Sequence, residues 1–203
     1  MDKITYVGFG DSLTYGYGVL NGISFMDRLK DTLPKEFPDK NWTTINSGIN
    51  GDTTREGLRR IYRDVIDHCP DIVTILFGSN DSALNDYQHR AITEFEINLE
   101  EITKLIQKET KAKIIFITPP PLIEDELFPF TTNKAVSAYS EVIRKNAAKY
   151  DCHLLDFNTI MAEEANGDLE PYLQYDGLHL SDKGYELIYK HILHTIKNLI
   201  QIT

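Results

Sequence analysis

A serine directly follows the first apolar segment of the chain, in the stretch YVGFGDSLTYG that spans residues 6–16. The apolar run stops at Gly10-Asp11-Ser12, so a hydroxyl stands where the backbone must turn. Glycine, aspartate and serine also favour turns and helix caps for local hydrogen-bonding reasons, so this stretch alone fits a plain turn before a helix. A serine hydroxyl becomes a good nucleophile only when a base removes its proton. The chemistry of Ser12 therefore depends on a base elsewhere in the chain.

An aspartate and a histidine further along the chain have the types and spacing of such a base and its partner. Asp176 and His179 lie in DGLHLSDKG, close enough in sequence for their side chains to meet on one side of a turn. A carboxylate beside an imidazole fixes its tautomer and stabilises its cation, while the outer ring nitrogen stays free to face a hydroxyl. The alternative is a turn capped by Asp176, with His179 as an ordinary surface residue. The first interpretation predicts that His179 faces Ser12.

Two polar clusters in the middle of the chain hold groups that can stabilise a negative oxygen. They are NSGINGDTT, residues 46–54, and GSND, residues 78–81. Acyl transfer needs donors aimed at the oxyanion of the tetrahedral intermediate, and a loop glycine lets its backbone N–H approach closely while an asparagine amide adds a neutral donor. Gly48 and Asn80 have this chemistry, although both residue types also serve ordinary turns.

The elements that must position these groups alternate between strand and helix. Apolar runs predict strands over residues 3–9, 41–45, 71–77, 113–118 and 152–157, and helical periodicity predicts helices over residues 53–66, 93–110, 133–150 and 182–200. Thr93 with Glu96 fits a capping box, and Asn133 and Ser181 are the expected caps of the last two helices. Nearly continuous apolar strands belong to a parallel sheet covered on both faces. The pattern predicts an α/β fold, a three-layer αβα sandwich with about five strands.

The predicted architecture brings the polar clusters together. In parallel α/β sheets, ligands bind beyond the carboxyl ends of the strands, and Ser12 and the two middle clusters each follow a predicted strand. The DGLHLSDKG cluster precedes the last helix and can reach the same crevice. The segment LIEDELFPFTTN, residues 122–133, has no clean periodicity and either borders this crevice or covers a sheet edge.

The four motifs FGDSLT, NSGINGDT, GSND and DGLHLS, in this order, resemble those of the SGNH (GDSL) hydrolase superfamily. The resemblance extends over nearly the whole chain and implies a flavodoxin-like sheet. It implies that Ser12 is the nucleophile, His179 the base and Asp176 its partner. It also implies an oxyanion hole formed by the backbone N–H of Ser12 together with Gly48 and Asn80.

A narrower similarity concerns the substrate. FGSNDSAL, ITPPPLIE and DGLHLSDKG are similar to the branch that includes isoamyl-acetate-hydrolysing esterases, which implies small carboxylic esters cleaved through an acyl-enzyme. On this interpretation Asp11 shapes the turn around Ser12, and neither a cofactor nor a metal is required. A thioesterase, a lysophospholipase and a carbohydrate deacetylase would use the same residues. A noncatalytic binding module is the alternative from a different class.

A metal-centred interpretation would need other residues. His191 and His194 have H-x-x-H spacing, and His68 neighbours Cys69, but neither pair supplies three or four ligands. Two cysteines in a chain of this size make no disulfide framework, so Cys69 and Cys152 are expected to be reduced packing residues.

Composition narrows the class of protein and its partners. The 203 residues are 41% hydrophobic and 26% charged, which predicts one globular domain over residues 1–203. A formal charge of −10 opposes general attraction to nucleic acid or an anionic membrane surface. MDKITYVGFGDS lacks the pattern of a secretory signal, and no run has the length of a membrane span, so a cytoplasmic protein without stable membrane insertion is expected. The sequence leaves the oligomeric state open.

Overall fold

Five parallel strands form the centre of the computed structural model, which describes residues 2–127 and 129–201. The strands are β1 (Asp2–Gly10), β2 (Lys40–Gly48), β3 (Ile72–Leu76), β4 (Lys113–Ile117) and β5 (His153–Leu155). They lie in the order β2-β1-β3-β4-β5, and every neighbouring pair is parallel. This is the doubly wound, flavodoxin-like order, so the predicted α/β fold is confirmed.

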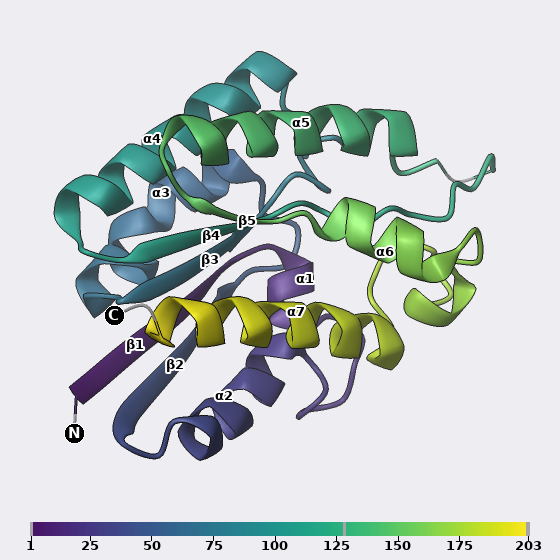
Figure 1. Cartoon of the computed structure of the whole chain (residues 1–203). Coiled ribbons are helices and arrows are strands. Elements are labelled where there is room, and N and C mark those ends of the chain that lie inside the picture. The colour runs from purple at the N-terminus through teal and green to yellow at the C-terminus, as the bar shows by residue number, and fades with distance from the viewer. Residues whose placement is uncertain (1, 128, 202–203) are drawn as a thin grey trace.

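Helices cover both faces of the sheet (Figure 1). One face carries α2 (Phe25–Glu36), α6 (Phe157–Ala165) and α7 (Asp182–Gln201), and the other carries α3 (Thr54–Asp64), α4 (Ile92–Glu109) and α5 (Asn133–Lys149). Short turns complete the described elements: α1 (Ser12–Tyr15), η1 (Ile66–His68) and η2 (Glu170–Tyr172). The result is the predicted three-layer arrangement.

The central strand shows why the sheet is buried on both sides. All five residues of β3, IVTIL, are buried. Successive strand side chains point to opposite faces, so Ile72 and Leu76 pack with α2 and α7, whereas Val73 and Ile75 pack with α3 and α4. Such a continuous apolar run is stable only between two layers of helices.

The helix caps differ in part from the expected ones. Helix α4 begins at Ile92 without a side-chain cap, so the box expected at Thr93 and Glu96 is wrong, and the capping box belongs to Thr53 and Glu56 of α3. Thr132, rather than the expected Asn133, caps α5 by accepting the N–H of Ala135 at 3.1 Å. Ser181 does cap α7, because its Oγ accepts the N–H of Gly184 at 3.2 Å.

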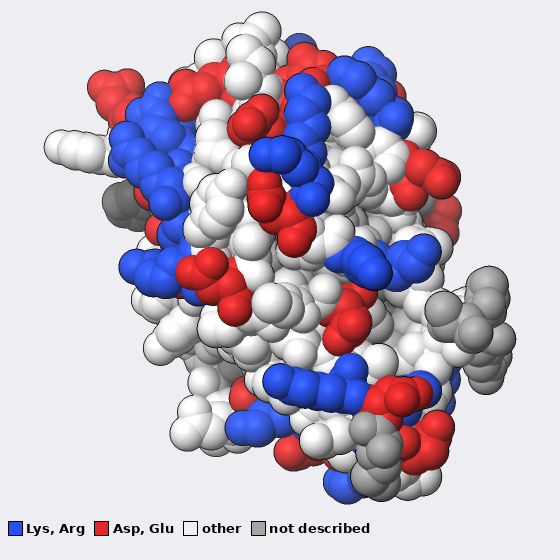
Figure 2. All heavy atoms as spheres, turned by 90° about the vertical axis from the view of Figure 1, so that its left-hand side faces the viewer, with Lys and Arg blue, Asp and Glu red and all other residues white. Residues whose placement is uncertain are grey.

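The strands begin on the left-hand side of Figure 1, which is the face turned toward the viewer in Figure 2. Positive and negative side chains are interspersed over this face, with no broad field of one sign. Lys40 at the start of β2, for example, lies 3.8 Å from a carboxylate oxygen of Asp2 and of Asp39. Among the described helices, none is both long and apolar enough to cross a membrane.

Candidate active site

Ser12 is the first residue of α1, directly beyond the carboxyl end of β1. Asp11 caps this short helix, because its Oδ1 accepts the N–H of Leu13 at 2.9 Å. The backbone N–H of Ser12 has no partner within the helix, as is usual for a first helical residue. Ser12 is buried in this packed turn and is only 8% exposed.

His179 lies against Ser12 and is itself held by Asp176. The Nε2 of His179 lies 3.1 Å from Ser12 Oγ, and its Nδ1 lies 2.7 Å from Asp176 Oδ2. Asp176 Oδ1 also accepts the backbone N–H groups of Leu178 and His179, both at 2.9 Å. The predicted approach of His179 to Ser12 agrees with this arrangement. Chemically, it is a hydroxyl, an imidazole and a carboxylate in one hydrogen-bonded line.

The electrostatics of the turn favour an ionised Asp176. Partial burial raises the pKa of this carboxyl, but the hydrogen bonds from the His179 ring and from two backbone N–H groups outweigh burial, so the pKa lies below its usual value. The ring of Tyr17 covers the imidazole, with the two ring centroids 4.4 Å apart. Gln174 supports both, since its N–H donates to the His179 carbonyl at 2.7 Å and its Nε2 to the Tyr17 carbonyl at 2.8 Å.

A small hollow of ≈ 180 Å³ opens beside Ser12. It is lined by Ser12, Tyr17, Asn50, Gly51, Asn80, Gln88, Phe130, Leu178 and His179. Pockets for drug-sized ligands usually enclose about 300–1,000 Å³. The hollow therefore suits a small group attached to the reacting atom.

Gly48, the expected oxyanion donor, does not line this hollow. Its N–H donates to Asn46 Oδ1 at 3.0 Å, and a Cβ at this position would meet the Tyr15 backbone nitrogen at 2.2 Å. Gly48 is paired with Gly10 at the end of the β1–β2 ladder, so its role in the structure is close backbone packing. The Gly48 N–H thus has a partner within its own motif, and the expected donor role of Gly48 stays a prediction that the contacts of this residue do not support.

Gly51, three residues later in the same motif, is the glycine that lines the hollow. It adopts φ +80°, a backbone conformation that favours glycine. Its surroundings are open, because the atom nearest to a hypothetical Cβ would be Gln88 Nε2 at 3.6 Å. Its backbone N–H is bonded to no other part of the chain that the structure describes. The signal in the sequence was the second glycine of NSGINGDTT.

Asn80 reaches the hollow from the loop after β3. Its Nδ2 donates to the Asp52 carbonyl at 2.8 Å, and its Oδ1 accepts Gln88 Nε2 at 3.0 Å. Asn80 is buried, with only 5% of its surface exposed. Sequence reasoning had not identified Gln88, and its only signal was its position shortly after GSND.

A buried arginine ties together the loops that carry these groups. Arg60 of α3 donates from Nη2 to the Gly10 carbonyl at 2.8 Å and from Nη1 to the Ser47 carbonyl at 2.7 Å. Its Nε donates to Asp52 Oδ2 at 2.7 Å. The carboxyl ends of β1 and β2 and the loop that holds Gly51 are thereby fixed to one side chain.

Two buried carboxyl groups lie behind the hollow. Burial raises the pKa of Asp11 to about 7, although the Leu13 N–H partly offsets it, and burial raises that of Asp81 to about 6. Asp81 Oδ1 accepts the N–H and the hydroxyl of Thr54, at 3.0 and 2.6 Å, so it fixes the loop after β3 to the start of α3. These groups hold the architecture of the site in place.

The remaining sequence candidates lie elsewhere. His191 and His194 are on α7, and no cluster of three His, Cys, Asp or Glu side chains suited to a metal ion occurs within residues 2–127 and 129–201. In segment 122–133, residue 128 lies outside the described residues, Phe130 lines the hollow and the Ile123 N–H donates to the Gly177 carbonyl at 2.9 Å. The segment thus borders the turn that carries Asp176.

Comparison with known proteins matches the sequence of this chain to one family. The profile of the GDSL-like Lipase/Acylhydrolase family matches residues 9–187. The chain is 32% identical to the isoamyl acetate-hydrolyzing esterase 1 homolog of Rattus norvegicus, over 91% of this chain and 78% of that protein. It is 27% identical to the isoamyl acetate-hydrolyzing esterase of Saccharomyces cerevisiae, over 97% and 87% of the two chains.

A solved structure agrees over the full fold. The lipase/acylhydrolase of Enterococcus faecalis is 30% identical, with a TM-score of 0.80 over 98% of this chain and 96% of that one. The family match includes every motif from Ser12 to His179.

Proposed function

The chain belongs to the GDSL-like lipase/acylhydrolase family and is a serine ester hydrolase, and we propose that it cleaves small carboxylic esters through an acyl-enzyme on Ser12. The observation that carries the proposal is the 3.1 Å contact between Ser12 Oγ and His179 Nε2, backed by the 2.7 Å contact of His179 Nδ1 with Asp176. The small hollow beside Ser12 supports a short acyl group.

The reaction follows from these contacts. Ser12 Oγ attacks the ester carbonyl carbon while His179 Nε2 takes the hydroxyl proton, and the Asp176 carboxylate stabilises the imidazolium. The tetrahedral intermediate collapses, and His179 returns the proton to the leaving alcohol. Water then attacks the acyl-enzyme, with His179 again accepting a proton, and the carboxylic acid leaves from the regenerated Ser12.

The oxyanion needs donors on the side of the hollow away from His179. We assign this role to the backbone N–H groups of Ser12 and Gly51 and to Asn80 Nδ2, which line the hollow together. Fixed neutral donors of this kind stabilise the charge that develops on the carbonyl oxygen without reorganising during the reaction. The chemistry needs no metal or cofactor in any of these steps.

The test is a series of p-nitrophenyl esters of increasing acyl length, with Ser12→Ala as the control. We expect the highest kcat/KM for acetyl and butyryl esters and loss of hydrolysis in Ser12→Ala. Rates that rise toward long chains would contradict the small-ester proposal and favour a lipid or thioester substrate. Full activity in a folded Ser12→Ala protein would contradict the assignment of the nucleophile.

A further inference from the structure

We propose that Gln88 is a positioning residue of this esterase, which aims the Nδ2 of Asn80 at the oxyanion by binding Asn80 Oδ1. The inference rests on the proposed function, in which Asn80 donates to the oxyanion. It is carried by a chain of three side-chain amides, those of Asn85, Gln88 and Asn80, that ends at the hollow beside Ser12.

Each amide in this chain donates to the next one. Asn85 Nδ2 donates to Gln88 Oε1 at 3.0 Å, and Gln88 Nε2 donates to Asn80 Oδ1 at 3.0 Å. A donor whose own carbonyl accepts a hydrogen bond is polarised, and such chains strengthen their terminal donor. In this structure the terminal donor is Asn80 Nδ2.

Backbone groups fix the direction of all three amides. The Gln88 N–H, which can only donate, bonds Asn85 Oδ1 at 3.0 Å. The carbonyls of Gly51 and Asp52, which can only accept, lie 3.4 Å from Gln88 Nε2 and 2.8 Å from Asn80 Nδ2. A flipped amide at any of the three positions would therefore place two donors or two acceptors against each other.

This direction leaves a donor for the reaction. Asn80 Nδ2 carries two hydrogens, and the bond to the Asp52 carbonyl uses one of them. The second is available on the side where Asn80 lines the hollow with Ser12 and His179. Gln88 also donates to the carbonyl of Gly51. One side chain therefore contacts both Asn80 and Gly51, the two proposed oxyanion donors other than Ser12.

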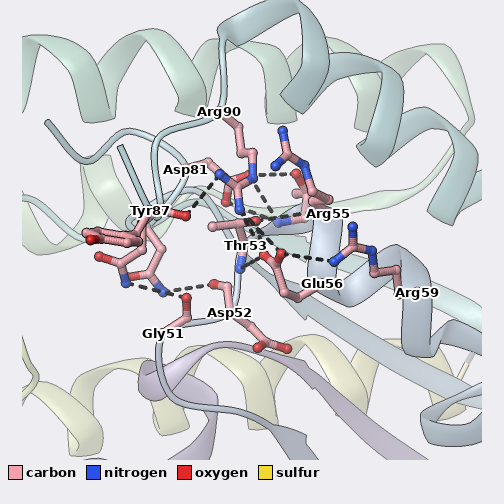
Figure 3. A network of polar contacts seen from close by, with 12 residues as sticks. Gly51, Asp52, Thr53, Arg55, Glu56, Arg59, Asp81, Tyr87 and Arg90 are labelled. Atoms are coloured by element: carbon pink, nitrogen blue, oxygen red, sulfur yellow. Dashed lines mark hydrogen bonds and ion pairs between the residues drawn. The ribbon is translucent and has the colours of Figure 1, made fainter. Parts of the chain in front are cut away.

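The segment that carries Gln88 is itself held firmly. Arg90, whose side chain is 5% exposed, donates to the carbonyls of Tyr87 and His89 at 3.1 and 2.8 Å, and its Nη2 lies 3.3 Å from Glu56 Oε1. Figure 3 shows Arg90 and Glu56 in this network, with Gly51 and Tyr87 at its edge. Gln88 is thus anchored to the start of α3 on a braced loop, which suits a positioning role.

The first test compares Gln88→Ala with Tyr87→Ala on p-nitrophenyl acetate. Removing Gln88 leaves the oxygen of a buried amide unpaired, so we expect kcat to fall on the order of tenfold with little change in KM. The Tyr87 side chain is 91% exposed on the same loop, and its removal should leave kcat unchanged. Equal losses in the two variants would overturn the proposal, because the loop rather than the amide would then matter.

The second test uses Gln88→Glu and a pH series. Near pH 7 the introduced carboxylate cannot donate to Asn80 Oδ1, whereas its protonated form can, and an ordinary glutamate gains its proton at roughly pH 4.3. We therefore expect the ratio of wild-type kcat to variant kcat to narrow as the pH falls from about 7 to about 5. A ratio independent of pH would contradict positioning by donation.

A double-mutant cycle separates this inference from the proposed function. Asn80→Ala should lose on the order of 10²–10³ in kcat if Asn80 is an oxyanion donor. Adding Gln88→Ala to Asn80→Ala should then change kcat by less than about twofold, because Gln88 acts through Asn80. A harmless Asn80→Ala would remove Asn80 from the proposed mechanism. A large Asn80 effect with an additive Gln88 effect would overturn only the positioning role.

Discussion

At the scale of single residues, one carboxylate both shapes the turn and orients the proposed base. Asp176 Oδ1 accepts two backbone N–H groups, and Oδ2 faces the His179 ring. An i, i+3 spacing in a tight turn provides all three bonds, which is why the pair could be predicted from the sequence. The hydrogen bonds that lower the pKa of Asp176 favour its ionised form, which the proposed mechanism uses to stabilise an imidazolium.

Asp176→Asn should abolish most of the activity while the chain stays folded. The amide oxygen can still accept the two backbone N–H groups, which leaves the amide NH2 group facing His179 Nδ1. The NH2 group donates to Nδ1, so the ring carries its proton on Nε2 and cannot accept the Ser12 proton there. We expect kcat to fall on the order of 10⁴. The measurement is steady-state hydrolysis of p-nitrophenyl acetate at neutral pH, beside a thermal melt.

The matched control is Glu170→Gln, which removes a carboxylate from the hollow on the outer side of the same turn. Its kcat should equal that of the wild type. A similar loss in both variants would point to the general charge near the turn rather than to orientation of the ring.

The glycine proposed as an oxyanion donor shows what sequence reasoning at this scale cannot decide. NSGINGDTT contains two glycines, and both residues are compatible with a loop donor. The choice depends on strand register: pairing of Gly10 with Gly48 places Gly48 inside the ladder, and Gly51 falls beyond it. Register is a long-range property, so the motif alone could not decide between them.

At the scale of elements, the close packing of β2 on α1 sets the position of Ser12. Gly48 lies at the end of β2, directly against the backbone of α1. A Cβ added to Gly48 would lie 2.2 Å from the Tyr15 backbone nitrogen, so there is no room for a side chain. Backbone atoms cannot move aside as a flexible side chain does. The turn that carries Ser12 therefore rests directly on the neighbouring strand.

Gly48→Ala should displace α1 and lower both activity and stability. Since α1 begins with Ser12, we expect kcat to fall at least about tenfold, and overpacking of this kind usually costs about 1–3 kcal/mol. The readouts are kcat on a short ester and the midpoint of thermal unfolding. Gly167→Ala is the control: Gly167 has φ +91° and no neighbour within 4 Å, so strain there should lower stability and leave kcat intact.

Helix α2 shows why some elements were not predicted. Its apolar stripe consists of Phe25, Met26, Leu29 and Leu33, all buried, but Pro34 lies inside the helix and its sequence alternates charges with apolar residues. A proline removes a backbone donor and normally argues against a helix interior. Packing of the stripe against β2 and α7 outweighs that local cost, and only tertiary structure supplies it.

At the scale of the whole molecule, alternation of buried strands and helices was enough to predict the fold. Runs such as DIVTILF and KIIFIT are too apolar for a half-exposed sheet, and parallel strands with helical crossovers place their carboxyl ends at one edge. Convergence of Ser12 and Asn80 follows from this topology, whereas His179 reaches them from the loop before α7. The sequence predicted that Asp11 shapes the turn around Ser12, but the burial of Asp11 and Asp81 depends on packing and was not predicted.

These buried carboxyls give the molecule a pH-dependent stability of a definite sign. The pKa of Asp11 is raised by burial to about 7, well above the ordinary value of an aspartate in the unfolded chain. The folded protein therefore holds a proton that the unfolded chain has released, and stability must fall as the pH rises through this interval. The contribution of Asp11 is complete below about pH 4 and is lost by about pH 7.

Asp11→Asn should flatten this dependence, because the amide keeps an oxygen for the Leu13 N–H and never ionises. Between about pH 5 and pH 8 we expect the unfolding midpoint of the wild type to fall by roughly 5 °C or more beyond the fall in the variant. Thermal denaturation of both proteins in matched buffers measures the difference. Parallel profiles would mean that Asp11 is already ionised in the fold, with its charge stabilised by groups around α1. A flattened profile would mean instead that the turn holding Ser12 is most stable when the carboxyl beneath it is neutral.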